Sequence, residues 1–151
     1  MTSRFVVAIA VASVVGVGGR SLLPGPASAA TTVTVYKSPT CGCCAKWVDH
    51  LRVAGYTVVV HDTDNLDEVM TDFTVPRQLA SCHTAKVGKY VVEGHVPADL
   101  IAKVLREHPA IAGLAVPGMV TGSPGMEGGA AQHYDVVAWT AAGQTSVYAR
   151  R

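Results

Sequence analysis

Three of the four cysteines lie within four consecutive residues, Cys41-Gly42-Cys43-Cys44, and the segments on either side of them predict a local fold. The β-type run Val33–Tyr36 precedes the cysteines, and after them apolar residues recur at helical spacing up to Gly55, a typical helix stop. Tyr56–His61 is rich in β-branched residues and predicts a buried second strand. Residues 33–61 therefore predict a parallel β-α-β unit with the cysteines at the N-terminus of its helix.

The rest of the chain continues the alternation of helix and strand. The expected elements are, in order, a helix over 66–73, a helical turn over 76–79, strands over Cys82–Val87 and Tyr90–His95, a helix that Pro97 opens and Pro109 ends, and a hairpin of His133–Trp139 with Thr145–Tyr148. The predicted fold class is α/β with the order β-α-β-α-β-β-α, followed by a C-terminal β-hairpin extension.

The first 29 residues indicate a secretory signal. A short basic start is followed by the apolar run Phe5–Val17, which is shorter than the roughly 20 residues that a membrane-spanning helix needs. Ala27-Ser28-Ala29 then supplies a small-x-small cleavage pattern. We therefore expect a signal peptide over 1–29, one domain over 30–151, a periplasmic or secreted location and no stable membrane span.

Charge argues against one class of partner. The formal net charge of the chain is +1, and without the two arginines of the expected signal 10 basic side chains face 11 acidic ones. Proteins that bind nucleic acid normally carry clustered Lys and Arg that neutralise phosphates, whereas the longest basic run here is Arg150-Arg151. The sequence therefore predicts no nucleic-acid partner.

Four cysteines in an exported protein usually form two disulfides. Here the crowding of three cysteines leaves poor choices for pairing, because the neighbours Cys43 and Cys44 cannot easily bond each other. Cys41 and Cys44 have the C-x-x-C spacing of a redox or metal pair, and Cys43 adds a third sulfur between them. A structural disulfide with one spare thiol stays open as the alternative.

Thiols at a helix start are suited to metal binding. Backbone N–H groups and the helix dipole stabilise thiolates, so we expect lowered cysteine pKa values in this cluster. Crowded thiolates repel one another and a soft cation relieves the repulsion; thiolate sulfur favours Cu(I), with Zn(II) and Cd(II) as other occupants. We expect Gly42 to let the chain turn tightly enough for the sulfurs to converge.

Cys82-His83 opens the expected third strand, which lies beside the first strand in a domain of this order. Cys82 is then a fourth sulfur near the cluster and His83 a candidate nitrogen ligand. Because side chains alternate along a strand, we expect only one of the two to face the cluster.

Met119 and Met126 lie in a Gly/Pro-rich stretch where little apolar periodicity requires them. Their thioether sulfurs are soft donors suited to binding or shielding Cu(I), although packing against the core explains them equally well. The remaining histidines are expected on solvent-facing helix positions, His50 and His108, or at strand ends as more remote metal candidates, His61, His95 and His133.

Four segments together resemble one known family: Tyr36–Cys44, Leu79–Thr84, Val92–Pro97 and Gly113–Met119. It is the exported family, catalogued as a domain of unknown function, that includes the copper-resistance protein CopG, and the resemblance spans residues 33–150. The resemblance implies a thioredoxin-like fold, periplasmic copper handling, a copper-thiolate cluster and interconversion of Cu(I) and Cu(II). By position it also implies the ligands, namely the sulfurs of Cys41, Cys43, Cys44 and Cys82, with His83, Met119 and Met126 as further candidates.

Three functions compete at this point. The first is a copper-resistance protein that holds Cu(I), as several ions on a thiolate cluster, with metal ions and other periplasmic copper-handling proteins as partners. The second is a thiol-disulfide oxidoreductase in which Cys41 attacks and Cys44 resolves. The third, with zinc in place of copper, is a structural site of three cysteines and His83.

Overall fold

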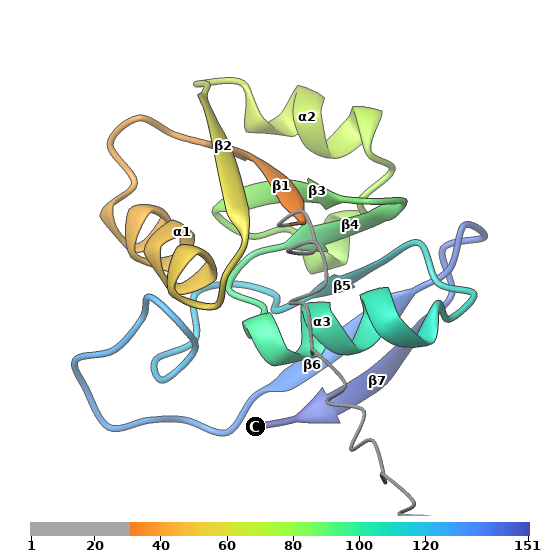
Figure 1. Cartoon of the computed structure of the whole chain (residues 1–151). Coiled ribbons are helices and arrows are strands. Elements are labelled where there is room, and N and C mark those ends of the chain that lie inside the picture. The colour runs from red at the N-terminus through yellow and green to blue at the C-terminus, as the bar shows by residue number, and fades with distance from the viewer. Residues whose placement is uncertain (1–30) are drawn as a thin grey trace, which may run out of the picture.

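The computed structural model describes residues 31–151, so the expected signal peptide over 1–29 lies outside the described residues (Figure 1). The elements are β1 (Thr32–Lys37), α1 (Gly42–Val53), β2 (Thr57–Asp62), α2 (Leu66–Asp72), a 3-10 helix (Arg77–Leu79), β3 (His83–Val87), β4 (Tyr90–Glu93), α3 (Ala98–Glu107), β5 (Gly113–Ala115), β6 (Asp135–Trp139) and β7 (Thr145–Arg150). The strands form one seven-stranded sheet in the order β2-β1-β3-β4-β5-β6-β7. The predicted order β-α-β-α-β-β-α is present in the elements from β1 to α3, with the 3-10 helix where a helical turn was expected.

The pairing of β1 positions the cysteines. β1 runs parallel to β2 and antiparallel to β3, with Lys37 opposite His83 in the second pair. The C-terminal end of β1 therefore lies beside the N-terminal end of β3. Because the Cys41–Cys44 segment follows β1 and Cys82 directly precedes β3, the two cysteine-bearing segments meet at one edge of the sheet.

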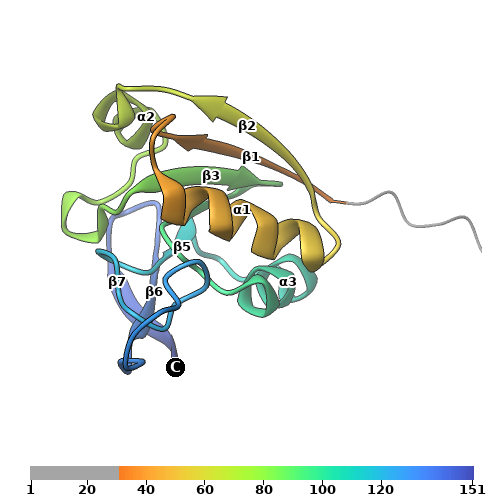
Figure 2. The same ribbon diagram turned by 90° about the vertical axis from the view of Figure 1, so that its left-hand side faces the viewer.

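Helices cover both faces of the sheet (Figure 2). α1 and α3 pack on one face, where the main core includes the α1 residues Trp47, Val48 and Leu51. α2 and the 3-10 helix lie on the other face, over a smaller cluster that contains Leu79 and Trp139. The indole N–H of Trp47 donates a 2.9 Å hydrogen bond to the carbonyl oxygen of Val96, which ties α1 to the segment before α3.

The expectation that the second strand is buried is wrong. β2 is an edge strand with no fully buried residue, and Val59 is 43% exposed. Its β-branched residues favour extended backbone at an edge as well as in the interior, so their pattern does not report burial. β5 has no counterpart among the expected elements. It has three residues and joins β4 to β6, so the C-terminal hairpin continues the same sheet.

The N-terminus of α3 has an unexpected cap. Its N-cap residue, Pro97, makes no side-chain capping bond, and the N–H of Ala98 instead donates to Nε2 of His50 on α1 at 3.1 Å. His50 was expected on the solvent face but is half-buried. Burial lowers the pKa of His50, while the nearby carboxylates of Glu127 and Asp99 act in the opposite direction.

No helix within residues 31–151 is long and apolar enough to cross a bilayer.

The cap predicts a pH-dependent contribution to stability. Only neutral His50 can accept the bond from Ala98, and a lowered folded-state pKa means that this contribution is present above the unfolded pKa near 6.5 and is lost as the pH falls below it. We expect His50→Ala to cost about 1 kcal/mol of unfolding free energy at pH 7.5 and clearly less at pH 5.5, measured by urea denaturation. The exposed His133, replaced by Ala, is the control; an equal cost of His50→Ala at both pH values would contradict the assignment.

Candidate metal centre

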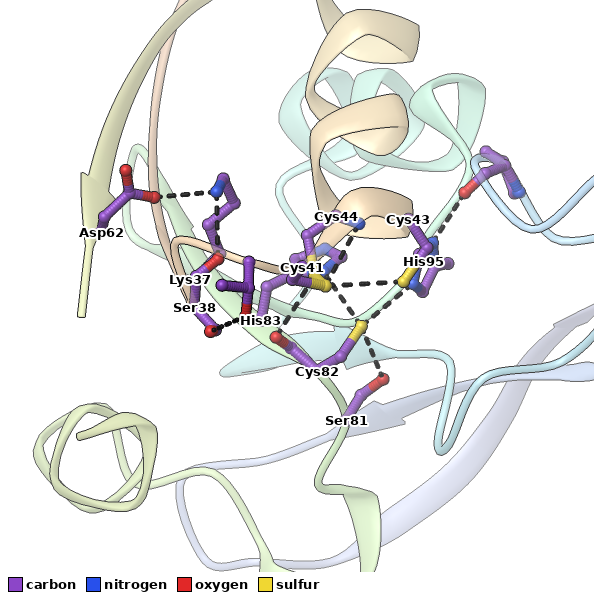
Figure 3. Close-up of a disulfide and its surroundings, with 12 residues drawn as sticks. Lys37, Ser38, Cys41, Cys43, Cys44, Asp62, Ser81, Cys82, His83 and His95 are labelled. Atoms are coloured by element: carbon purple, nitrogen blue, oxygen red, sulfur yellow. Dashed lines mark hydrogen bonds and ion pairs between the residues drawn. A yellow bond between two sulfur atoms is a disulfide. The ribbon is translucent and has the colours of Figure 1, made fainter. Parts of the chain in front are cut away.

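Three cysteines lie at the first turn of α1 (Figure 3). Cys41 is the N-cap residue, and its sulfur accepts the N–H of Cys44 at 3.4 Å. The turn before the helix is closed by the N–H of Cys41, which donates to the carbonyl oxygen of Ser38 at 3.1 Å. The expected special role of Gly42 is wrong, because this residue has no left-handed backbone and a Cβ there would meet no atom within 4 Å. The ordinary geometry of a helix start is enough to bring these sulfurs together.

The structure brings together the four sulfurs that the sequence analysis selected. The Sγ atoms of Cys41, Cys43, Cys44 and Cys82 all lie within 4.8 Å of one another. Sγ of Cys43 is 3.5 Å from Sγ of Cys41, and the fully buried Cys44 lies 3.4 Å from the carbonyl oxygen of Cys82. Residues far apart in the chain thus form one cluster.

The cluster is in an oxidised form. Cys41 and Cys44 are joined by a disulfide, and Cys43 and Cys82 are free. Four free thiolates were expected, so the structure corresponds in part to the alternative of one disulfide. Reduction of this bond by two electrons and two protons returns two thiols to the same place, so the disulfide and a set of four free thiols are alternative states of the same residues.

Cys82 also belongs to a second group of possible metal ligands, together with His83 and His95. This group and the four cysteines are called the two donor groups below. Sγ of Cys82 lies 3.0 Å from Nε2 of His95 and 3.5 Å from Nδ1 of His83, and both histidines are fully buried. Of Cys82 and His83, only Cys82 belongs to the group of four sulfurs, whereas His83 approaches that group through Cys82 alone. His95 was only a remote candidate; the signal that locates it is its place just beyond β4, which pairs with β3.

The loop before β6 orients His95. Nδ1 of His95 lies 2.8 Å from the carbonyl oxygen of Pro124, which can only accept, so Nδ1 carries the proton and Nε2 presents its lone pair to Cys82. Gly125 lets the same loop pack closely against the start of α1. It has φ +86°, and a Cβ there would lie 2.7 Å from the carbonyl oxygen of Cys43. A neutral imidazole with a fixed tautomer is the form that binds metals.

Burial sets the charge state of the site. It lowers the pKa of His83 to about 3, assisted by the neighbouring His95, and it lowers the pKa of His95 as well. Burial, with the negative charge of Cys43 added, raises the pKa of the Cys82 thiol to about 12. Cys82 lies opposite α1 instead of at its N-terminus, so the expected lowering does not apply to it, and a metal ion that binds there must displace its proton.

His83 contains an orphaned polar atom. Its ring packs against Trp47, with centroids 4.3 Å apart, and edge-on against His95 at 5.0 Å. Its Nε2 is buried and has no hydrogen-bond partner. Buried nitrogens are normally paired, so this ring nitrogen is open to a further partner, as is the indole N–H of Trp139 in the smaller core cluster.

The structure separates the two loop methionines. Met126 and Cys43 line the same open hollow of about 440 Å³, between the start of α1 and the loop before β6. Met119 is 59% exposed and is not among the residues that line this hollow. His61 stacks on Tyr36, with ring centroids 5.2 Å apart, and is not a member of either donor group in the part of the chain described.

One family model and two solved structures are similar to this chain. A family model described as "Protein of unknown function, DUF411" matches residues 79–126, which include Cys82, His83, His95 and both loop methionines. Two solved structures titled "Copper resistance protein copG", Form 2 and Form 1, are each 42% identical to this chain, with TM-scores of 0.77 and 0.76. Each match covers 81% of this chain and 98% of the other chain. No curated protein sequence matches the chain.

The raised pKa of Cys82 predicts that its thiol is alkylated slowly. At pH 8 a thiol with a pKa of about 12 is ionised to roughly one part in ten thousand, and alkylation requires the thiolate. We expect iodoacetamide to modify Cys82 of the native, metal-free protein at least about tenfold more slowly than Cys82 of the urea-unfolded protein, by peptide mass spectrometry. Equal rates in the two states would show that Cys82 is not buried as described.

Proposed function

The chain belongs to the family of copper resistance protein CopG, and from this premise we propose that it is an exported protein that binds Cu(I) on the sulfurs of Cys41, Cys43, Cys44 and Cys82. The observation that carries the proposal is the convergence of these four sulfurs within 4.8 Å. Both CopG structures bear the words copper resistance in their titles, and resistance by binding requires a site with high affinity for the soft ion.

The donor set fits a soft metal ion. Sulfur ligands about 2.3 Å from one tetrahedral ion lie about 3.8 Å apart, and Sγ of Cys41 and Sγ of Cys43 are 3.5 Å apart. Nε2 of His95 adds a neutral nitrogen donor beside Cys82, and His83 offers another. Nitrogen and sulfur also bind zinc, but a cluster dominated by thiolates favours Cu(I).

Charge supports the binding of several ions. Four thiolates around a single Cu(I) ion would leave three uncompensated negative charges in a partly buried site, which is costly. Several Cu(I) ions that share bridging sulfurs would neutralise this charge. We therefore propose a multi-copper thiolate cluster, with Met126 at its solvent side as a supplementary donor and Met119 as a more distant one.

The C-x-x-C pair allows electron exchange with copper. Oxidation of two Cu(I) ions to Cu(II) releases two electrons, and the Cys41–Cys44 disulfide takes up two electrons as it becomes two thiolates. The reverse reaction reduces two Cu(II) ions and restores the disulfide. We include this interconversion in the proposed function.

The export of the protein and the fold of its domain are also part of the proposal. A signal peptide over 1–29 would deliver the domain over 30–151 to the periplasm, where other copper-handling proteins would exchange metal with it. The strand order β2-β1-β3-β4, with the cysteine pair after β1, supports a thioredoxin-like arrangement for the first part of this domain.

Copper loading tests the proposal. We expect the protein, reduced and handled without oxygen, to retain more than one Cu(I) per chain, and Cys41→Ser, Cys44→Ser and Cys82→Ser each to reduce the loading sharply because each removes a sulfur ligand. Loading is measured against a chromophoric Cu(I) chelator, with the adjacent Thr40→Ala as the control.

Unchanged loading in the cysteine variants would contradict the ligand assignment. Retention of one zinc ion by the isolated protein, with unfolding on chelation, would instead support the structural zinc site.

The disulfide favours a second candidate, a thiol-disulfide oxidoreductase. Cys41 is partly exposed and Cys44 is fully buried, which suits an attacking and a resolving cysteine. In this reaction the Cys41 thiolate opens a substrate disulfide, Cys44 displaces the reduced substrate, and the pair is left oxidised.

Insulin reduction separates the two candidates. If the pair exchanges electrons with copper, the metal-free protein with dithiothreitol should precipitate insulin no faster than its Cys41→Ser variant, measured by turbidity. Acceleration by the metal-free wild type that Cys41→Ser abolishes would establish the oxidoreductase instead.

A further inference from the structure

Glu93 is a fully buried carboxylate that the site described above does not use. It lies on β4 opposite Thr84 of β3. Its Oε1 accepts the backbone N–H of Ser81 at 2.7 Å, and its Oε2 accepts the hydroxyl of Thr84 at 2.7 Å. The two donors stand immediately before and after the pair Cys82-His83.

A carboxylate in this position is costly to the fold. Burial raises the pKa of Glu93 to about 7, although the hydrogen bonds from Thr84 and Ser81 act against that rise. No Lys, Arg or His within residues 31–151 forms a salt bridge with it. A buried polar group without a counter-ion lowers stability unless its hydrogen bonds compensate, so its presence calls for a specific role.

The segment that Glu93 holds carries the sulfur shared by the two donor groups. Cys82 precedes the first residue of β3, so the strand pairing does not fix it. Ser81 is held instead by Glu93 and by a 2.5 Å bond from its hydroxyl to the carbonyl oxygen of Gly118. Gly94 permits this packing: a Cβ there would lie 2.5 Å from Oγ of Ser81, and its φ is +68°. Loss of the carboxylate would release the backbone N–H of Ser81 directly before Cys82 and leave the hydroxyl of Thr84 without its acceptor, while the backbone of Thr84 stays paired with β1 and β4.

We propose that Glu93 is a positioning residue for the copper site: it holds Ser81 and Thr84 so that Cys82 faces the Cys41–Cys44 turn. The inference rests on the proposed function in so far as its main readout is Cu(I) affinity. Glu93 itself touches no metal in this proposal and acts only through Cys82.

The decisive experiment is a double-mutant cycle on Cu(I) affinity, measured by chelator competition with the reduced full-length chain. We expect Glu93→Leu to lower the affinity about 10- to 100-fold, as is usual for residues that orient a ligand. In a Cys82→Ser background the same substitution should cause no further loss, because the side chain that it positions is already gone.

Glu93→Gln is the matched control. Its carbonyl oxygen can still accept from Ser81, and its amide can donate to the hydroxyl oxygen of Thr84, so we expect affinity within about twofold of wild type. Thr84→Val, which removes one of the two donors, gives an intermediate loss and serves as the second variant should Glu93→Leu fail to fold.

A metal-free readout separates failure of this inference from failure of the proposed function. Glu93→Leu and Thr84→Val should speed the alkylation of Cys82 by iodoacetamide, whereas Glu93→Gln should not. Faster alkylation in a protein that binds no Cu(I) would support the role of Glu93 and refute the copper site. The positioning role would be overturned if Cys82 of Glu93→Leu and of Thr84→Val were alkylated at the wild-type rate. It would also be overturned if Glu93→Leu lowered the Cu(I) affinity equally with and without Cys82.

Discussion

The antiparallel pairing of β1 with β3 is the constraint on which the site depends. Lys37 at the end of β1 faces His83 at the start of β3, so the helix start after β1 and the residue before β3 must share one edge of the sheet. Cys44 and Cys82, 38 residues apart in sequence, therefore come into contact. A shift of this register by two residues would move Cys82 by about 7 Å and remove it from the cluster.

Thiolates that crowd together in a partly buried site repel one another, and this repulsion can be relieved in several ways. A disulfide removes two potential charges, as in the Cys41–Cys44 bond, and a proton removes one, as the raised pKa of Cys82 indicates. A soft cation would replace both solutions at once. Disulfide formation and protonation thus compete for the same sulfurs, and any metal ion that binds them would do so with an affinity that depends on redox potential and on pH.

Local patterns in the sequence were sufficient for the order of the elements from β1 to α3 and for selecting the four cysteines that the fold brings together, because strand, helix and C-x-C-C signals span only a few residues. They were insufficient wherever contacts between distant segments decide the outcome. His95 enters the site because β4 pairs with β3 and because a loop some 30 residues later sets its tautomer. His50 caps a helix other than its own, and β5 is too short to show any periodicity.

The C-terminal part of the chain is a component of the site. β5 joins the sheet beside β4, which fixes the start of the loop that returns to α1 before β6. That loop supplies the carbonyl of Pro124 to His95 and, at Gly125, packs against the backbone of Cys43. The nitrogen donor and the sulfur-bearing helix are thus held by one loop, so a domain that ended after α3 would keep the four sulfurs but lose the group that presents Nε2 of His95 to Cys82.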